Sequence, residues 1–259
     1  MSSKQKVRSL FISDVHLANP NSQAKKLYDF LNNIEADYLF LLGDIVDLWK
    51  LSSHKGRWYK EHELVLKQIM EFARSGTRII YIPGNHDPFF RHFVGSHLGP
   101  VEVHEEYIHS LATEQTLLLI HGDRFDDELY MGDAWHVIGE WLYEGIVSAN
   151  RWLNVVRHKL DKPYWSLSVA LKMNSKKARH YIERFENLAV NYARSQGTDG
   201  VICGHIHQSK LTYIDGMIYG NDGDWVETCS ALVETQEGYL ELLSVNASHD
   251  PVSARLATA

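Results

Sequence analysis

The feature that most constrains this chain is a run of apolar residues that stops at a glycine and an acidic side chain. Residues Tyr38–Leu42 are followed directly by Gly43 and Asp44. A continuous apolar run of this length predicts a strand buried on both faces, as in a parallel sheet. Side chains at the carboxyl end of such a strand line the crevice where α/β folds bind ligands. Asp44 is therefore a candidate ligand, and N-capping of a following helix is the alternative.

Four further stretches repeat the pattern of an apolar strand that ends at polar side chains. We expect a strand at Val7–Ile12, followed by Asp14 and His16, and one at Arg78–Ile82, followed by Asn85, His86 and Asp87. We also expect a strand at Thr116–Ile120, followed by His121, and one at Val201–Cys203, followed by His205 and His207. Apolar residues at helical spacing predict helices over Gln23–Ile34 and Glu61–Arg74. Five strands ending at one rim would hold these side chains at a common site on rigid elements.

The segment 210–243 has a different pattern, in which short strands are separated by glycine-containing turns at Asp215-Gly216 and Glu237-Gly238. This pattern predicts antiparallel hairpins, built from strands at Leu211–Ile214, Met217–Tyr219, Cys229–Thr235 and Tyr239–Leu243. Residues 245–259 are polar and weakly patterned, and we expect them to form a flexible tail.

Composition limits the class of protein. A chain of 259 residues that is 44% hydrophobic can bury a large core in one domain with an insertion. Its net charge of -7 argues against a nucleic-acid partner. The two cysteines, Cys203 and Cys229, lie in apolar strands and are expected to be buried free thiols. The polar start Met1–Lys6 predicts no signal peptide, and no apolar run approaches the roughly 20 residues that span a bilayer. We therefore expect a cytoplasmic protein.

The side chains at the predicted rim form a mixed set of oxygen and nitrogen donors. A mixture of carboxylate, amide and imidazole suits Mn²⁺, Fe²⁺ or Zn²⁺ better than Ca²⁺ or Mg²⁺, and Mn²⁺ is the expected metal. Seven donors are too many for one tetrahedral ion, but they suit two ions that share a carboxylate. The candidate metal ligands are Asp14, His16, Asp44, Asn85, His121, His205 and His207.

These motifs, in this order, resemble the calcineurin-like metallophosphoesterase superfamily. The resemblance implies a four-layer α/β/β/α sandwich of the α/β class, with a dinuclear centre between its loops. It implies that one ion is held by Asp14, His16, Asp44 and His207, and the other by Asp44, Asn85, His121 and His205. It also implies that His86 gives a hydrogen bond or proton to the phosphoryl or leaving oxygen, while Asp47 and Asp87 orient the ligands or His86.

The stretch between the fourth and fifth motifs predicts an inserted helical lid. We expect a metallophosphoesterase domain over 1–132 and 193–244, and the lid over 133–192. The lid region is rich in aromatic residues, and basic residues dominate between 150 and 180. This composition suggests an apolar groove with a cationic rim, and peripheral contact with the anionic inner face of the membrane. The alternative is that the aromatic residues form the lid's own core and the lysines a solvated face.

An aromatic and basic insertion at this position is similar to that of the bacterial UDP-2,3-diacylglucosamine pyrophosphohydrolase branch of the superfamily. The resemblance implies a nucleotide-diphosphate-linked lipid as substrate, and it extends to a set of candidate substrate-binding residues: Asn85, Asp127, Tyr130, Asn174, Ser175, Lys176 and Lys177. The chain departs from that branch at His86, where the branch has arginine. The alternatives are a general phosphodiesterase or phosphomonoesterase acting on soluble nucleotides, and a metal-binding interaction module without catalysis.

Overall fold

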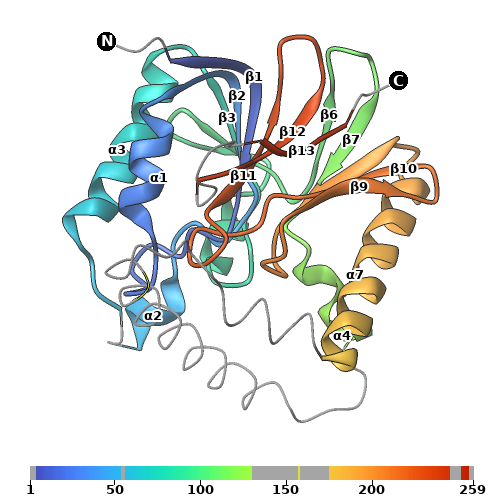
Figure 1. Ribbon diagram of the computed structural model, residues 1–259. Coiled ribbons are helices and arrows are strands. Elements are labelled where there is room, and N and C mark those ends of the chain that lie inside the picture. The colour runs from blue at the N-terminus through green and yellow to red at the C-terminus, as the bar shows by residue number, and fades with distance from the viewer. Residues whose placement is uncertain (1–3, 54–55, 130–156, 158–174, 246–251, 257–259) are drawn as a thin grey trace. The chain divides into compact units, whose positions relative to one another are not determined.

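The computed structural model describes residues 4–53, 56–129, 157, 175–245 and 252–256 (Figure 1). The chain divides into two compact units. The larger unit combines Met1–Asp123 with Ala189–Ala259, and the smaller one is Arg124–Leu188. Both sheets of the protein belong to the larger unit.

The first sheet has eight strands in the order β13-β12-β11-β1-β2-β3-β5-β4. Strands β1, β2, β3 and β5 are parallel to one another, whereas β11, β12, β13 and β4 pair with antiparallel neighbours. Consequently β1, β2 and β3 end at the same edge of the sheet. The strands are β1 (Gln5–Ile12), β2 (Ile34–Leu41), β3 (Arg78–Tyr81), β4 (His97–Leu98), β5 (Val101–Val103), β11 (Ser230–Glu234), β12 (Leu240–Ser244) and β13 (Val252–Leu256).

The second sheet has five strands in the order β6-β7-β8-β10-β9. Its three inner strands are parallel, and the outer strands β6 and β9 are antiparallel to their neighbours. The carboxyl ends of β7, β8 and β10 therefore lie at one edge. The strands are β6 (Tyr107–Ser110), β7 (Thr116–Leu119), β8 (Gly200–Cys203), β9 (Lys210–Ile214) and β10 (Met217–Asn221).

Burial of both faces explains the apolar runs. On one face of the first sheet, Phe11 and Phe40 stack with ring centroids 5.0 Å apart, in a core shared with Leu117, Leu119 and Ile202 of the second sheet. The residues next to them along β1 and β2, Leu10 and Leu39, face the opposite way. They pack in a core with apolar residues of α1 (Ala24–Leu31) and α3 (Lys60–Arg74). Successive side chains along each strand therefore point to opposite faces of the sheet and pack in two different cores.

The last turns of α7 (Lys176–Ser195) cover the second sheet. Ala189, Val190 and Ala193 are buried. Tyr192 donates a hydrogen bond to Glu106, which precedes β6, and Arg194 donates one to the carbonyl of Asp215 in the β9–β10 turn. The larger unit therefore has the predicted α/β/β/α order of layers. The shorter helices are α2 (Leu48–Ser52), η1 (Pro88–Phe93), η2 (Asp123–Phe125) and α4 (Asp126–Leu129).

The predicted fold class is confirmed, and each predicted strand and helix has a counterpart, with two corrections. The helix predicted over Gln23–Ile34 ends at Leu31, and Ile34 begins β2. Val252–Leu256 form β13, which pairs with β12, so a flexible tail is wrong for these five residues. Arg255 forms an ion pair with Glu241 of β12 and lies over the ring of Tyr239, contacts that fix the strand. The lid predicted over 133–192 lies largely outside the described residues and stays a prediction.

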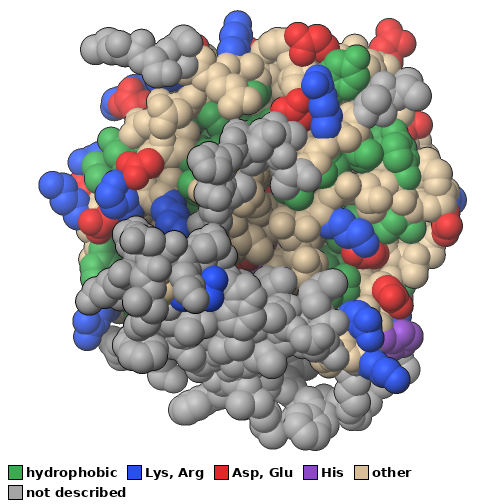
Figure 2. Space-filling view, viewed as in Figure 1, with side chains coloured by type: hydrophobic (Ala, Val, Ile, Leu, Met, Phe, Trp, Pro, Cys, Tyr) green, Lys and Arg blue, Asp and Glu red, His purple; other side chains and the backbone are tan. Residues whose placement is uncertain are grey.

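Other expectations concern the surface and the thiols. Cys203 and Cys229 are buried and free, as predicted. On the face seen in Figure 2, basic and acidic side chains are interspersed over the described surface. Among the described residues, no helix has the length and apolarity needed to cross a membrane.

Candidate functional site

The carboxyl ends of the parallel strands of both sheets meet at one place. The loops after β1, β2 and β3 carry Asp14, Asp44 and Asn85, and the loops after β7 and β8 carry His121 and His207. The ring nitrogen Nδ1 of His121 lies 2.7 Å from the carbonyl oxygen of Leu42, which joins the rims of the two sheets. Gly43 permits this approach, because a Cβ there would lie 2.3 Å from Nδ1 of His121.

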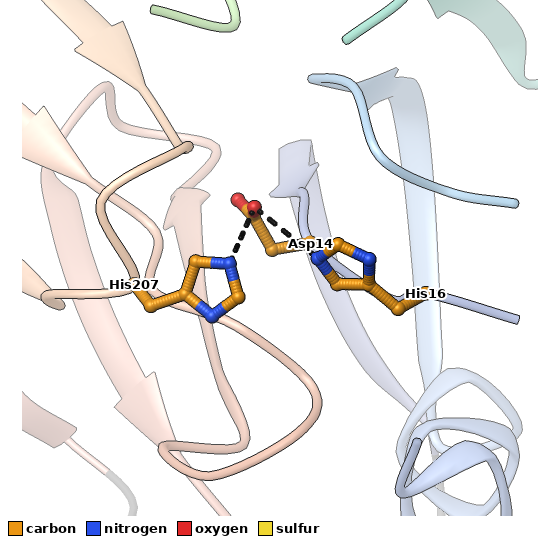
Figure 3. A group of neighbouring side chains, drawn as sticks. All are labelled: Asp14, His16 and His207. Carbon is orange, nitrogen blue, oxygen red and sulfur yellow. Dashed lines mark ion pairs between the residues drawn. The ribbon is translucent and has the colours of Figure 1, made fainter. Parts of the chain in front are cut away.

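One half of the site is formed by Asp14, His16 and His207 (Figure 3). Oδ1 of Asp14 lies 3.1 Å from Nε2 of His207 and 3.8 Å from Nε2 of His16. The other carboxylate oxygen, Oδ2, accepts a hydrogen bond of 2.9 Å from the backbone N–H of His205. Figure 3 shows the carboxylate between the two imidazole rings. One carboxylate oxygen of Asp14 is thus fixed by the backbone, while the other faces two imidazole nitrogens.

The other half is formed around Asp44. Its Oδ2 lies 3.6 Å from Nε2 of His121 and 3.7 Å from Nε2 of His16, so this carboxylate stands between the two halves. Oδ1 of Asn85 lies 3.1 Å from Nε2 of His121, and the ring centroid of His205 is 5.1 Å from that of His121. Asp44 does not cap a helix, because its Oδ1 accepts from the backbone N–H of His86 and Asp47 is the N-cap of α2. The ligand role of Asp44 therefore remains and the capping alternative is wrong.

Asp47 connects the site to His86. Its Oδ1 lies 3.3 Å from Nδ1 of His86, and its Oδ2 lies 3.6 Å from Nδ1 of His16. The same Oδ1 accepts a hydrogen bond of 2.9 Å from the backbone N–H of Lys50, which fixes the carboxylate at the start of α2. The indole of Trp49 packs on His86 with ring centroids 4.4 Å apart. The structure therefore holds His86 between a carboxylate and an aromatic ring at the edge of the site.

Asp87 makes other contacts than Asp47. Its Oδ1 accepts from the backbone N–H of Gly84, and its Oδ2 accepts from the N–H of Ile45 and from the hydroxyl of Tyr81. These bonds tie the loop after β3 to the loop after β2. Asp87 is fully buried, and these hydrogen bonds make it an anchor of the two loops. Its predicted role in orienting the ligands or His86 stays a prediction.

The buried charges of the site perturb one another. Burial lowers the pKa of His121, but the carboxylates of Asp44 and Asp14 outweigh it and raise this pKa to about 9. Burial likewise opposes ionisation of Asp14 and Asp47, yet the neighbouring histidines hold the pKa of each carboxyl below its usual range. For Asp14 the largest opposing influence is His207, and for Asp47 it is the contact with His16. The carboxylates and imidazoles of the site thus favour one another's charged forms.

The backbone of the ligand loops is strained. The φ angles of Asp14, His16, Asp44, His205 and His207 lie between 49° and 71°, in the left-handed region. Aspartate and histidine enter this region more readily than most residues, but each such residue still costs of the order of 1 kcal/mol. Strain of this kind gathers at binding sites, where the surrounding fold imposes the geometry.

Several buried polar atoms of the site have no hydrogen-bond partner among the described residues. They are Oδ1 of Asp14, both ring nitrogens of His16, Oδ2 of Asp47 and Nδ1 of His86. Buried polar atoms are normally paired, because leaving one unpaired costs about 1–3 kcal/mol. Three groups of potential ligand atoms have all members within 4.8 Å of one another: Asp14, His16 and His207; His16, Asp44 and His86; Asp14, Asp44 and His121. Divalent cations satisfy such atoms, so the residues present fit a metal centre.

Two further acidic residues of this region were missed by the sequence analysis. Asp222 and Asp224 follow β10, and Oδ2 of Asp224 lies 3.9 Å from Nδ1 of His207. Ser13 lies within hydrogen-bond distance of both Asp14 and Asp222. Burial raises the pKa of Asp222 well above its usual range. The signal was available, because Asn221-Asp222-Gly223-Asp224 after a strand repeats the pattern of the other five motifs.

The predicted substrate-binding residues other than Asn85 belong to the smaller unit or lie outside the described residues. Asp127 is exposed in α4, and Ser175 and Lys176 are exposed at the start of α7, where Oγ of Ser175 accepts from the N–H of Ala178. Lys177 is in the first turn of α7. Tyr130 and Asn174 lie outside the described residues. The role of these residues in binding substrate stays a prediction.

Comparison with known proteins identifies a family and relatives. A sequence profile of the calcineurin-like phosphoesterase family matches residues 7–209. The UDP-2,3-diacylglucosamine hydrolase of Haemophilus influenzae is 22% identical over 234 residues, 88% of this chain and 95% of the relative. The enzyme of the same name from Chromohalobacter salexigens is 29% identical over 130 residues, 48% of this chain and 50% of the relative. Among solved structures, the phosphoesterase Yfce from E. coli aligns with a TM-score of 0.46 and 14% identity, over 96% of this chain and 98% of that chain.

Proposed function

The chain belongs to the calcineurin-like phosphoesterase family and is a metal-dependent hydrolase of phosphoester or pyrophosphate bonds, and we propose that its substrate is a nucleotide-diphosphate-linked lipid such as UDP-2,3-diacylglucosamine. The observation that carries the proposed chemistry is the group of buried, unpaired oxygen and nitrogen atoms at the rim of both sheets. The observation that supports the lipid substrate is the name shared by the relatives, together with the aromatic and basic composition of the insertion.

The proposed metal centre uses the two halves of the site. Asp14, His16 and His207 would hold one ion, Asn85, His121 and His205 the other, and Asp44 both. Two bound divalent ions would lower the pKa of a water molecule and neutralise charge on the phosphoryl oxygens. Imidazole and carboxylate donors favour Mn²⁺, Fe²⁺ or Zn²⁺, and we propose Mn²⁺.

In this proposal His86 supplies the proton that the leaving oxygen needs. Its ring is about a quarter exposed, with a side-chain exposure of 24%, so a substrate can reach it. The carboxylate of Asp47 faces Nδ1, which leaves Nε2 for the substrate. Because Asp47 is itself fixed by the N–H of Lys50, the imidazole has one preferred orientation. Asp47 is thus a positioning residue for His86, in the manner of a carboxylate that orients a general acid or base.

Substitution of the candidate ligands tests the proposed centre. Asn85→Ala and His121→Ala should each reduce Mn²⁺-dependent turnover by about 10³-fold, because each removes an oxygen or nitrogen donor from the proposed centre. Asn33→Ala and His97→Ala replace exposed residues of the same types and serve as matched controls. Circular dichroism should show an unchanged fold in all four variants. Unchanged hydrolysis in the Asn85 or His121 variant would reject the assignment.

A comparison of substrates tests the lipid proposal. We expect hydrolysis of UDP-2,3-diacylglucosamine to have a much higher kcat/KM than that of bis(p-nitrophenyl) phosphate or cyclic nucleotides. A preference for the soluble substrates would instead support a general phosphodiesterase. Metal binding without hydrolysis of any of these compounds would support the non-catalytic module.

We also propose peripheral contact with an anionic membrane through the insertion. Its support is the basic composition of residues 150–180, since each lysine or arginine near an anionic surface contributes about 1 kcal/mol. The protein should sediment with vesicles that contain anionic lipid at low salt, and not with vesicles of neutral lipid alone. Equal recovery in the supernatant with both kinds of vesicle would contradict this contact.

A further inference from the structure

Asp222 is a buried carboxyl group that the proposed chemistry does not use. It follows β10, has no exposed surface, and its Oδ1 lies 2.6 Å from the hydroxyl oxygen of Ser13. The same hydroxyl oxygen contacts Oδ2 of Asp14, on the side away from the histidines that face Oδ1. A continuous chain of contacts therefore runs from Asp222 through Ser13 to a candidate metal ligand.

Hydrogen-bond chemistry limits how this chain can be arranged. A serine hydroxyl has one hydrogen to donate and accepts others. Contact with two carboxyl oxygens therefore needs a second proton, which one of the carboxyl groups supplies. Burial raises the pKa of Asp222 well above its usual range, which favours this carboxyl as the one that supplies the proton. In this arrangement Oδ2 of Asp14 accepts the hydroxyl hydrogen of Ser13.

Neighbouring contacts close off other positions for the Asp14 carboxylate. The N–H of His205 also binds Oδ2 of Asp14, at 2.9 Å. A Cβ on Gly204 would lie 2.2 Å from the hydroxyl oxygen of Ser13 and 2.5 Å from Oδ2 of Asp14, so only glycine fits beside this contact. The amide of Asn221 donates to the carbonyl of Gly204 at 2.7 Å, which fixes the end of β10 against the end of β8.

Stability does not explain why a carboxyl group stands at position 222. Oδ2 of Asp222 is buried and has no hydrogen-bond partner among the described residues. An unpaired buried oxygen opposes folding, and an apolar residue of similar volume would avoid that cost. The contact with Ser13, and through it with Asp14, is what the carboxyl group adds.

We propose that Asp222 is a positioning residue that acts through Ser13 to fix Oδ2 of Asp14, so that Oδ1 of Asp14 is held toward a divalent cation. The inference rests on the proposed metal centre, but not on the proposed substrate. Residues that orient metal ligands in this way change metal affinity by about 10- to 100-fold when they are replaced.

The test measures Mn²⁺ binding to the metal-free protein by calorimetric titration. Asp222→Leu and Ser13→Ala should each raise the dissociation constant of the weakened site by about 10- to 100-fold. Asp222→Asn keeps a neutral polar group next to Ser13 and should stay within about threefold of the original protein. Asp222→Leu should also retain or raise the midpoint of urea unfolding. A lowered midpoint with unchanged Mn²⁺ affinity would assign Asp222 to the fold alone and overturn the proposal.

A double-mutant cycle tests the path through Ser13. If Asp222 acts through that hydroxyl, the variant carrying Ser13→Ala and Asp222→Leu binds Mn²⁺ no more weakly than the weaker of the single variants. Losses that multiply would show independent effects and overturn the proposal. Ser9→Ala is the matched control, since the Ser9 hydroxyl, within β1, also donates to a buried carboxylate, Glu234, and its loss should leave Mn²⁺ affinity unchanged.

Hydrolysis assays separate this inference from the proposed function. Weakened Mn²⁺ binding in Asp222→Leu, with no hydrolysis of UDP-2,3-diacylglucosamine by the original protein, would reject the substrate and uphold the positioning role. Failure of the original protein to bind Mn²⁺ would overturn both the proposed centre and the positioning role.

Discussion

Two polar clusters along β1 use carboxylate and histidine side chains to opposite effect. In the middle of the strand, Ser9 donates to Glu234, whose carboxylate also binds Arg8 at 2.6 Å, His109 at 2.9 Å and the N–H of Ala112 at 2.8 Å. This network joins β1 and β11 in the first sheet to β6 in the second. At the end of the same strand, Oδ1 of Asp14 and both ring nitrogens of His16 remain without hydrogen-bond partners among the described residues.

Whether the buried polar atoms of a cluster have hydrogen-bond partners distinguishes a cluster that stabilises the fold from one that binds a ligand. The Glu234 network has partners for its carboxylate oxygens, so it contributes to folding and specifies how the sheets meet. The Asp14 cluster leaves atoms unpaired on a backbone held in the left-handed region, so it opposes folding until cations bind. Substitutions in the Glu234 network and in the Asp14 cluster should therefore have opposite consequences for stability and for activity.

The largest effect is expected from Asp44→Asn. The carboxylate faces both His16 and His121, and its loss should weaken binding in both halves of the site and lower turnover by about 10³-fold. The metal-free variant should be at least as stable as the original protein, because a buried charge is removed. Parallel measurements of hydrolysis and urea unfolding check both statements. An Asp44→Asn variant that loses stability together with activity would contradict the statement that the metal-binding cluster opposes folding.

Replacement of His86 sharpens the assignment within the site. His86→Ala should lower kcat by about 100-fold while Mn²⁺ affinity stays unchanged, because His86 acts on the proton and not on the metal. The structure also groups His86 with His16 and Asp44 as potential ligands, so the measurement is decisive. A loss of Mn²⁺ affinity equal to that of His121→Ala would make His86 a ligand.

The third prediction concerns the Glu234 network. Glu234→Ala leaves the N–H of Ala112 and the side chains of Ser9 and His109 without their shared acceptor, and should lower the free energy of unfolding by about 3 kcal/mol. Turnover per folded molecule should not change. Glu71→Ala removes an exposed ion pair with Arg74 and should cost less than about 0.5 kcal/mol. Lost activity in folded Glu234→Ala would show that the Glu234 network and the Asp14 cluster are coupled.

The smallest effect is a pH dependence of stability. Burial raises the pKa of Glu234, but hydrogen bonds from His109, Ser9 and Ala112 outweigh it and lower this pKa. A carboxyl whose pKa is lowered on folding stabilises the protein above its unfolded pKa of about 4.3, and this contribution is lost as the pH falls through the folded pKa. The stability difference between the original protein and Glu234→Gln should therefore stay constant above about pH 5 and shrink as the pH falls below about 4.3. A difference that stays constant at still lower pH would contradict the shift.

The strands, the fold class and most of the site followed from one physical rule. Parallel strands buried on both faces give continuous apolar runs, and their carboxyl ends share an edge, so Asp14, Asp44, His121 and His207 could be brought together on paper. Asp47 was assigned to His86 on resemblance, and the structure places it against both His86 and His16.

The same rule was not applied to β10, so its carboxyl end was left out of the predicted site. The hairpin predicted for Met217–Tyr219 is confirmed, because β10 pairs antiparallel with β9. On its other side β10 pairs in parallel with β8 and ends at the site, and that partner is set by packing between distant segments, which no local sequence pattern indicates. Strand β13 was missed for a related reason, because its pairing with β12 and the packing of Ala254 and Leu256 on the core bring together segments that the local sequence pattern does not connect.

The most direct test of the account is the number of Mn²⁺ ions bound per chain, measured by calorimetric titration and elemental analysis of the dialysed protein. The account predicts about two ions per chain for the original protein, and neither ion at the same affinity after Asp14→Asn and Asp44→Asn are combined. No bound metal in the original protein, or undiminished binding in the doubly substituted one, would contradict it.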